Sequence, residues 1–126
     1  MNSISTNSIY SLLPTLRAFS AQLEAAKKVL AVPQPANSPF HQLQMVEIKK
    51  MESISMQFLS SLLHQCRHIN EQVFKQLNLL ADCWQKTIEL PSIDTTAKRI
   101  KALSDFIDSI IAILENAEIQ ERIKQV

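Results

Sequence analysis

The stretch from Pro39 to Leu90 contains no glycine, and no proline after its first residue, over 52 positions. Apolar residues recur in it at steps of three and four. This stripe comprises Met51, Ile54, Phe58, Leu62, Cys66, Ile69, Val73, Leu77, Leu80, Trp84 and Ile88. An α-helix places such positions on one face, whereas a strand alternates at every second residue. The stretch is therefore predicted to be helical along its length.

The absence of glycine from all 126 residues restricts which folds and which functional sites the chain can form. Phosphate-binding loops, dinucleotide-binding turns and nucleophile elbows need glycine where the backbone bends sharply or approaches a ligand. Tight β-hairpins also favour residues with positive φ. The composition therefore favours an all-α protein and argues against these common nucleotide-binding and hydrolase sites.

Two proline-containing segments divide the chain into three long predicted helices. The helices cover about residues 14–32, 39–90 and 95–124. The segment PQPANSP ends the first helix, and Ser38 followed by Pro39 is a typical cap and first-turn pair for the second. The segment PSID ends the second helix, and Asp94 is expected to cap the third. We treat residues 1–13 as a flexible polar leader and 14–126 as a single helical domain.

The middle helix leaves two architectures open. Its most polar part is HQCRHINEQ, residues 64–72. A break near residue 68 would give four helices in an antiparallel bundle with coiled-coil-like seams. An unbroken helix would span about 78 Å and would leave a wide apolar face for a partner.

The apolar stripe of the middle helix supplies the candidate binding residues. The interaction face that we predict comprises Ile54, Phe58, Leu62, Ile69, Val73, Leu77 and Trp84. Burial of this face would be driven by the apolar area removed from water. The sequence leaves open whether an internal core, another subunit or a granule surface covers it.

The polar residues do not form a recognisable catalytic, cofactor or metal motif. His64 and His68 are four positions apart and Glu71 follows, a spacing that can hold a metal. Gln65 stands where the metalloprotease motif requires glutamate. We therefore predict no enzyme activity, no catalytic or cofactor-binding residues and no metal site.

The two cysteines and the overall charge bear on the cellular environment. Cys66 and Cys83 lie on or beside the apolar stripe, which predicts buried free thiols in a reducing compartment. The formal net charge of +1 lacks the basic footprint of a nucleic-acid-binding domain. No run of 18 apolar residues is present, so no transmembrane helix is predicted. Of these features, the free thiols favour a reducing compartment.

The first residues, MNSISTNSIYS, are uncharged and rich in serine. They resemble the leaders of bacterial proteins that are exported by type III secretion. This resemblance gives an alternative: a secretion substrate or secretion-associated helical protein that acts through protein–protein contacts.

The span from about Phe40 to Ile123 resembles bacterial phasins, small helical proteins that coat polyhydroxyalkanoate granules. The resemblance rests on the long glycine-free amphipathic helix, on the break at LPSID and on the helix AKRIKALSDFIDSIIAILENAE. It implies a bacterial, cytoplasmic, non-enzymatic coat protein that forms oligomers and adsorbs to an apolar polymer surface. The apolar face itself leaves a second copy or another helical protein open as the partner.

Overall fold

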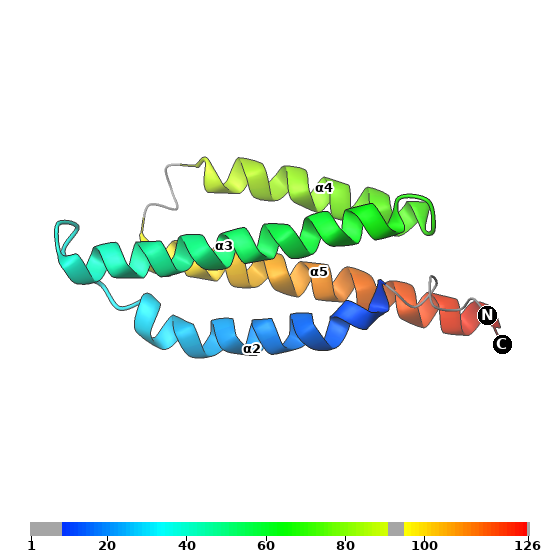
Figure 1. Ribbon diagram of the computed structural model, residues 1–126, viewed down its shortest axis with the longest axis horizontal. Helices are drawn as coiled ribbons and strands as arrows, with labels where there is room; N and C mark the ends of the chain where they lie inside the picture. The colour runs from blue at the N-terminus through cyan, green and yellow to red at the C-terminus, as the bar shows by residue number, and fades with distance from the viewer. Residues whose placement is uncertain (1–8, 91–94, 126) are drawn as a thin grey trace.

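The computed structural model describes residues 9–90 and 95–125, and these form an elongated bundle of α-helices without strands (Figure 1). The elements are the 3-10 turn η1 (Tyr10–Leu12) and the helices α2 (Leu13–Leu30), α3 (Pro39–Cys66), α4 (Glu71–Ile88) and α5 (Thr96–Gln125). The prediction of an all-α helical bundle is confirmed, and the four helices correspond to the architecture with a broken middle helix. None of the described helices is long and apolar enough to span a membrane.

Asn70 caps the start of α4, where the helix resumes after the break in the middle stretch. The backbone of Asn70 is extended, with φ −140° and ψ 95°, and its Oδ1 accepts a hydrogen bond from the Val73 amide at 3.1 Å. The amide N–H groups in the first turn of a helix lack helical acceptors, and this side chain supplies one. The chain therefore reverses direction between α3 and α4, and no described residue adopts a positive φ.

The helices α3 and α5 also begin with a side-chain cap. Ser38 Oγ accepts a hydrogen bond from the Phe40 amide at 3.1 Å, and Pro39 occupies the first position of α3, as predicted. At the start of α5, Thr95 Oγ1 accepts a hydrogen bond from the Lys98 amide at 3.2 Å. Asp94, which we predict as the cap of this helix, lies outside the described residues.

The bundle is organised around α5, because this helix contacts α2, α3 and α4 (Figure 1). Its fully or almost fully buried apolar residues are Ile100, Leu103, Phe106, Ile107, Ile110 and Leu114. Burial of each such side chain stabilises the fold by about 1.5–3 kcal/mol relative to its exposure. α5 therefore provides much of the core, although the longest apolar stripe in the sequence belongs to α3 and α4.

Two aromatic pairs connect the helices. Phe19 of α2 and Phe58 of α3 meet edge to face, with ring centroids 5.5 Å apart. Trp84 of α4 stacks on Phe106 of α5 at 4.6 Å, with 14° between the ring planes. Such pairs add about 0.5–1.5 kcal/mol beyond the area that they bury. They therefore tie α2 to α3 and α4 to α5.

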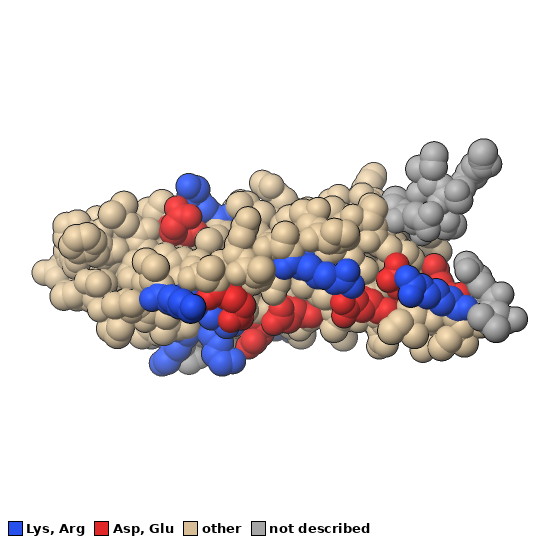
Figure 2. Space-filling model, turned by 90° about the horizontal axis from the view of Figure 1, so that it is seen from below, with Lys and Arg blue, Asp and Glu red and all other residues tan. Residues whose placement is uncertain are grey.

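A polar seam follows the boundary between α2 and α5. Arg17 Nη2 lies 2.7 Å from Glu115 Oε2, and Ser20 Oγ donates a hydrogen bond to Asp108 Oδ1 at 2.9 Å. Charged side chains of both signs line the face shown in Figure 2. Exposed ion pairs contribute little to the free energy of unfolding. The seam therefore mainly determines the orientation of α2 relative to α5.

The folded body includes residues 9–13, which fall within the leader that we predict from the sequence. Ile9 and Leu13 are buried, and only 8% of Tyr10 is exposed. The turn η1 runs directly into α2. The described end of the leader is therefore part of the apolar core, and residues 1–8 lie outside the description.

Candidate functional site

The predicted interaction face is divided between the core and the surface. The buried members are Leu62, Val73, Leu77 and Trp84. Phe58 is half-buried against Phe19, whereas Ile54 and Ile69 are exposed. The buried members pack inside the bundle, so the seven residues do not form one continuous surface.

Among the described residues, an apolar surface lies instead at the connection between α2 and α3, where five of the eleven exposed large apolar side chains are found. We call its residues the hairpin patch: Val29, Val32, Phe40, Leu43 and Val46. The exposed fractions of Val29, Phe40 and Leu43 are 67%, 66% and 65%. The end of the molecule that carries this connection shows no charged side chain in the view of Figure 2. Single exposed apolar residues are common, but a cluster of this kind marks a contact surface.

A recess of about 390 Å³ lies within the hairpin patch. Val29 and Val32 line it from the end of α2, and Phe40 and Leu43 line it from the start of α3. Glu47 is the only charged residue in its lining. The recess can therefore admit an apolar side chain from a binding partner.

Gln44 fixes the geometry of this recess. The side chain is buried, and its Nε2 donates hydrogen bonds to the carbonyl oxygens of Val29 and Val32, both at 3.0 Å. The Val29 carbonyl also accepts a hydrogen bond from the Val32 amide at 3.4 Å, so Gln44 adds a second donor to this helix end. One side chain thereby ties the end of α2 and the connection that follows it to α3.

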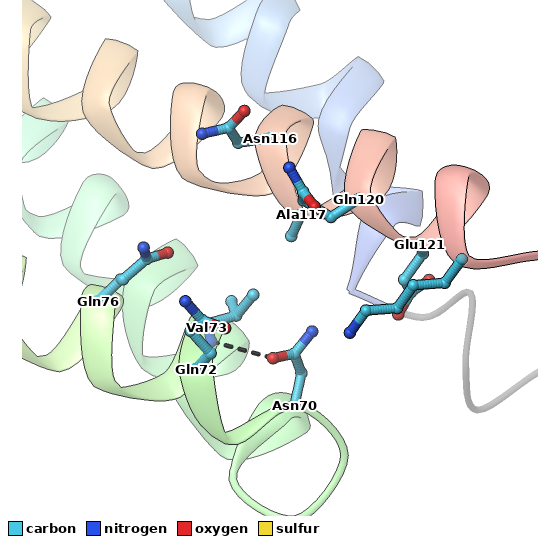
Figure 3. Close-up of a pocket in the computed structure, with 9 residues that line it drawn as sticks. Asn70, Gln72, Val73, Gln76, Asn116, Ala117, Gln120 and Glu121 are labelled. Carbon is cyan, nitrogen blue, oxygen red and sulfur yellow. Dashed lines mark hydrogen bonds between the residues drawn. The ribbon is translucent and has the colours of Figure 1, made fainter.

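A second recess, of about 380 Å³, lies between the start of α4 and the last turns of α5 (Figure 3). We call it the amide pocket. Its lining comprises Asn70, Gln72, Val73, Gln76, Asn116, Ala117, Gln120, Glu121 and Lys124. Five of these nine side chains end in a carboxamide, and none is a histidine, a cysteine or an aromatic residue. The pocket therefore offers hydrogen bonds rather than nucleophilic chemistry or ring stacking.

Tyr10 lies beside the amide pocket. Its hydroxyl group is buried, and the side chains of Glu121 and Asn70 lie close enough to interact with it. Burial raises the pKa of Tyr10 to about 12, and the nearby Glu121 carboxylate contributes to the increase. The phenol is therefore neutral at physiological pH.

The histidines do not form the arrangement that their spacing allows in a continuous helix. α3 ends at Cys66, between His64 and His68, and both histidines are exposed. Within residues 9–90 and 95–125, no group of three His, Cys, Asp or Glu side chains is placed to hold a metal ion.

The two cysteines lie in different environments. Cys66 is buried, its thiol donates to the Leu62 carbonyl, and burial raises the pKa of that thiol. Cys83 is exposed on α4. The prediction of a buried free thiol is therefore confirmed for Cys66 and wrong for Cys83, because Cys83 lies at the outer edge of the stripe.

Comparisons with known proteins identify no relative. No family model matches the chain, and the searches of curated proteins and of solved structures found no match. The function must therefore be argued from the surfaces described above.

Proposed function

We propose that this protein is a non-enzymatic helical binding protein that assembles through the hairpin patch, with a second copy of the chain as its partner. The observation that carries the proposal is the exposure of Val29, Phe40 and Leu43 around a preformed recess. Covering apolar surface stabilises a complex by about 25 cal/mol per Å² before the costs of association. The patch thus supplies the driving force for binding.

The shape of the hairpin patch supports a protein partner with the same surface. The recess and the projecting side chains of Phe40 and Leu43 belong to one patch. A surface that carries both features can bind its own copy across a twofold axis, because each copy inserts a side chain into the other.

The charges near the patch permit such an approach. Glu47 lies at the recess, and Lys50 Nζ lies 3.4 Å from its Oε1. This pair balances the charge of Glu47, which is the charged residue in the lining of the recess. A patch of five side chains is small for a stable interface, and we expect reversible association with a Kd of about 1–100 μM.

Sedimentation velocity of the purified chain over a range of concentrations tests the proposal. We expect the wild type to shift from monomer to dimer and Phe40→Asp to remain monomeric. Position 40 lies in the first turn of α3, where aspartate is compatible with the helix dipole, so the variant should fold. Leu79→Asp is the matched control, because Leu79 is equally exposed on α4 and lies outside the patch. A wild type that stays monomeric, or equal effects of the two variants, would contradict the proposal.

The exposed apolar side chains of the hairpin patch also support a second candidate, adsorption to an apolar polymer granule as the phasin resemblance implies. Co-sedimentation with polyhydroxybutyrate granules tests it. Phe40→Asp should reduce the bound fraction severalfold, and Leu79→Asp should leave it unchanged. Granule binding that is lost equally in both variants, or that is absent in the wild type, would remove this candidate without affecting the dimer.

A further inference from the structure

We propose that the amide pocket binds an extended peptide segment of a partner protein through its main chain. This site is separate from the hairpin patch. The α2–α3 connection lies at one end of the bundle, whereas the start of α4 and the last turns of α5 lie at the other (Figure 1).

The spacing of the carboxamides fits an extended peptide. Gln72 and Gln76 are one turn apart on α4, and Asn116 and Gln120 are one turn apart on the antiparallel helix α5 (Figures 1 and 3). Four residues of α-helix rise about 6 Å. Peptide groups on the same side of an extended chain repeat at about 6.7 Å. Each pair can therefore face two successive peptide groups on one side of a bound segment.

The chemistry of the lining fits the same ligand. A carboxamide offers one acceptor and two donor hydrogens, which complement the N–H and C=O groups of a peptide. Val73 and Ala117 supply a small apolar area between the polar side chains. The charged lining residues, Glu121 and Lys124, have opposite signs, so the pocket does not select an anion or a cation. A neutral main chain is the ligand that uses the most lining groups.

Asn70, Glu121 and Tyr10 form a polar cluster at one end of the pocket. Asn70 Oδ1 already accepts from the Val73 amide, which leaves its Nδ2 as a donor toward the pocket (Figure 3). The buried Tyr10 hydroxyl lies beside Asn70 and Glu121, and both side chains affect its pKa. A ligand that binds to Asn70 or Glu121 in the pocket therefore changes the surroundings of the phenol. Peptide binding should therefore be reported by Tyr10.

The test uses the full chain and a blocked tetra-alanine peptide, acetylated and amidated so that only its main chain can interact. In an NMR titration we expect saturable shifts of asparagine and glutamine side-chain amide signals. The double variant Gln76→Leu with Asn116→Leu removes one carboxamide from each helix and should weaken binding at least about tenfold. Both positions are exposed, so the fold should be retained.

Matched controls make the result decisive. The double variant Asn78→Leu with Gln85→Leu makes the same chemical change outside the pocket and should bind as the wild type does. An N-methylated form of the peptide lacks N–H donors and should also bind at least about tenfold more weakly. The proposal would be overturned if the methylated peptide bound as tightly as the unmethylated one, or if both double variants lost affinity equally. The absence of any saturable shift would also overturn it. Shifts with maltotriose but not with the peptide would overturn it in favour of a carbohydrate site.

Discussion

Arg99 of α5 and Glu52 of α3 form a two-pronged ion pair that is largely shielded from solvent. Arg99 Nε donates to Glu52 Oε2 at 2.8 Å, and Nη2 donates to Oε1 at 3.2 Å. Only 19% and 12% of the two side chains are exposed. A positive charge in the first turns of a helix opposes the helix dipole. The cross-helix pair offsets this cost and accounts for the arginine near the start of α5.

Loss of the Glu52 carboxylate should be costly, because it would leave a shielded guanidinium without its partner. We expect Glu52→Ala to lower the free energy of unfolding by about 2–3 kcal/mol. Glu115→Ala breaks the Arg17–Glu115 pair, which is short but exposed, and should cost less than about 1 kcal/mol. Urea unfolding measures both values. Equal effects of the two substitutions would show that burial does not distinguish these pairs.

The cap at Asn70 should be replaceable only by a side chain that accepts a hydrogen bond. We expect Asn70→Ala to lower the free energy of unfolding by about 1 kcal/mol. Asn70→Asp should stay close to the wild type, since a carboxylate accepts the same bond from the Val73 amide. Thermal unfolding followed by circular dichroism compares the two. An aspartate variant as unstable as the alanine variant would exclude a capping role.

The ionisation of Tyr10 should make the protein less stable at high pH. Its pKa of about 12 exceeds the ordinary value of 10.0, so between these values the folded chain binds more protons than the unfolded chain. The stabilisation is therefore complete below pH 10 and is lost as the pH rises through 12, with a total on the order of 2 kcal/mol. The free energy of unfolding of the Tyr10→Phe variant should decline less steeply with pH over this range.

The chain contains one tyrosine, so ultraviolet titration of tyrosinate reports Tyr10 directly. Because the Glu121 carboxylate contributes to the raised pKa, Glu121→Gln should lower it. An unchanged titration in this variant would show that the carboxylate does not affect the phenol.

The two thiols should react at very different rates. Cys83 is exposed, whereas Cys66 is buried and the pKa of its thiol is raised. Because the thiolate is the reactive species, an aromatic disulfide reagent should modify one thiol per native chain rapidly and the second only when the chain unfolds. Cys83→Ser should remove the rapid phase. Two rapid phases in the native wild type would contradict the burial of Cys66.

The sequence predicts the helices well because their apolar periodicity is local information. It leaves open whether the middle stretch breaks, although the possible break near residue 68 agrees with the end of α3 at Cys66 and the start of α4 at Glu71. The central role of α5 is not predictable in this way. Periodicity shows that a helix has an apolar face, but it does not show which helix will cover that face.

The hairpin patch illustrates the same difficulty. Phe40, Leu43 and Val46 recur at steps of three and form a short apolar row that precedes the main stripe. This row is the signal in the sequence that points to the patch. The exposure of its residues depends on how α3 lies against α4 and α5, which the sequence pattern does not specify. The amide pocket likewise arises only when α4 and α5 are brought together.

Photocrosslinking between purified copies tests the central claim, that the hairpin patch is the contact surface, most directly. A photoreactive phenylalanine analogue is placed at position 43 in one sample and at position 79 in another. After illumination, mass spectrometry identifies the joined peptides. We expect the analogue at position 43 to produce covalent dimers joined within residues 29–47, and the analogue at position 79 to produce almost none. Dimers that form only from position 79, or no dimers from position 43 at concentrations above the Kd, would contradict the account.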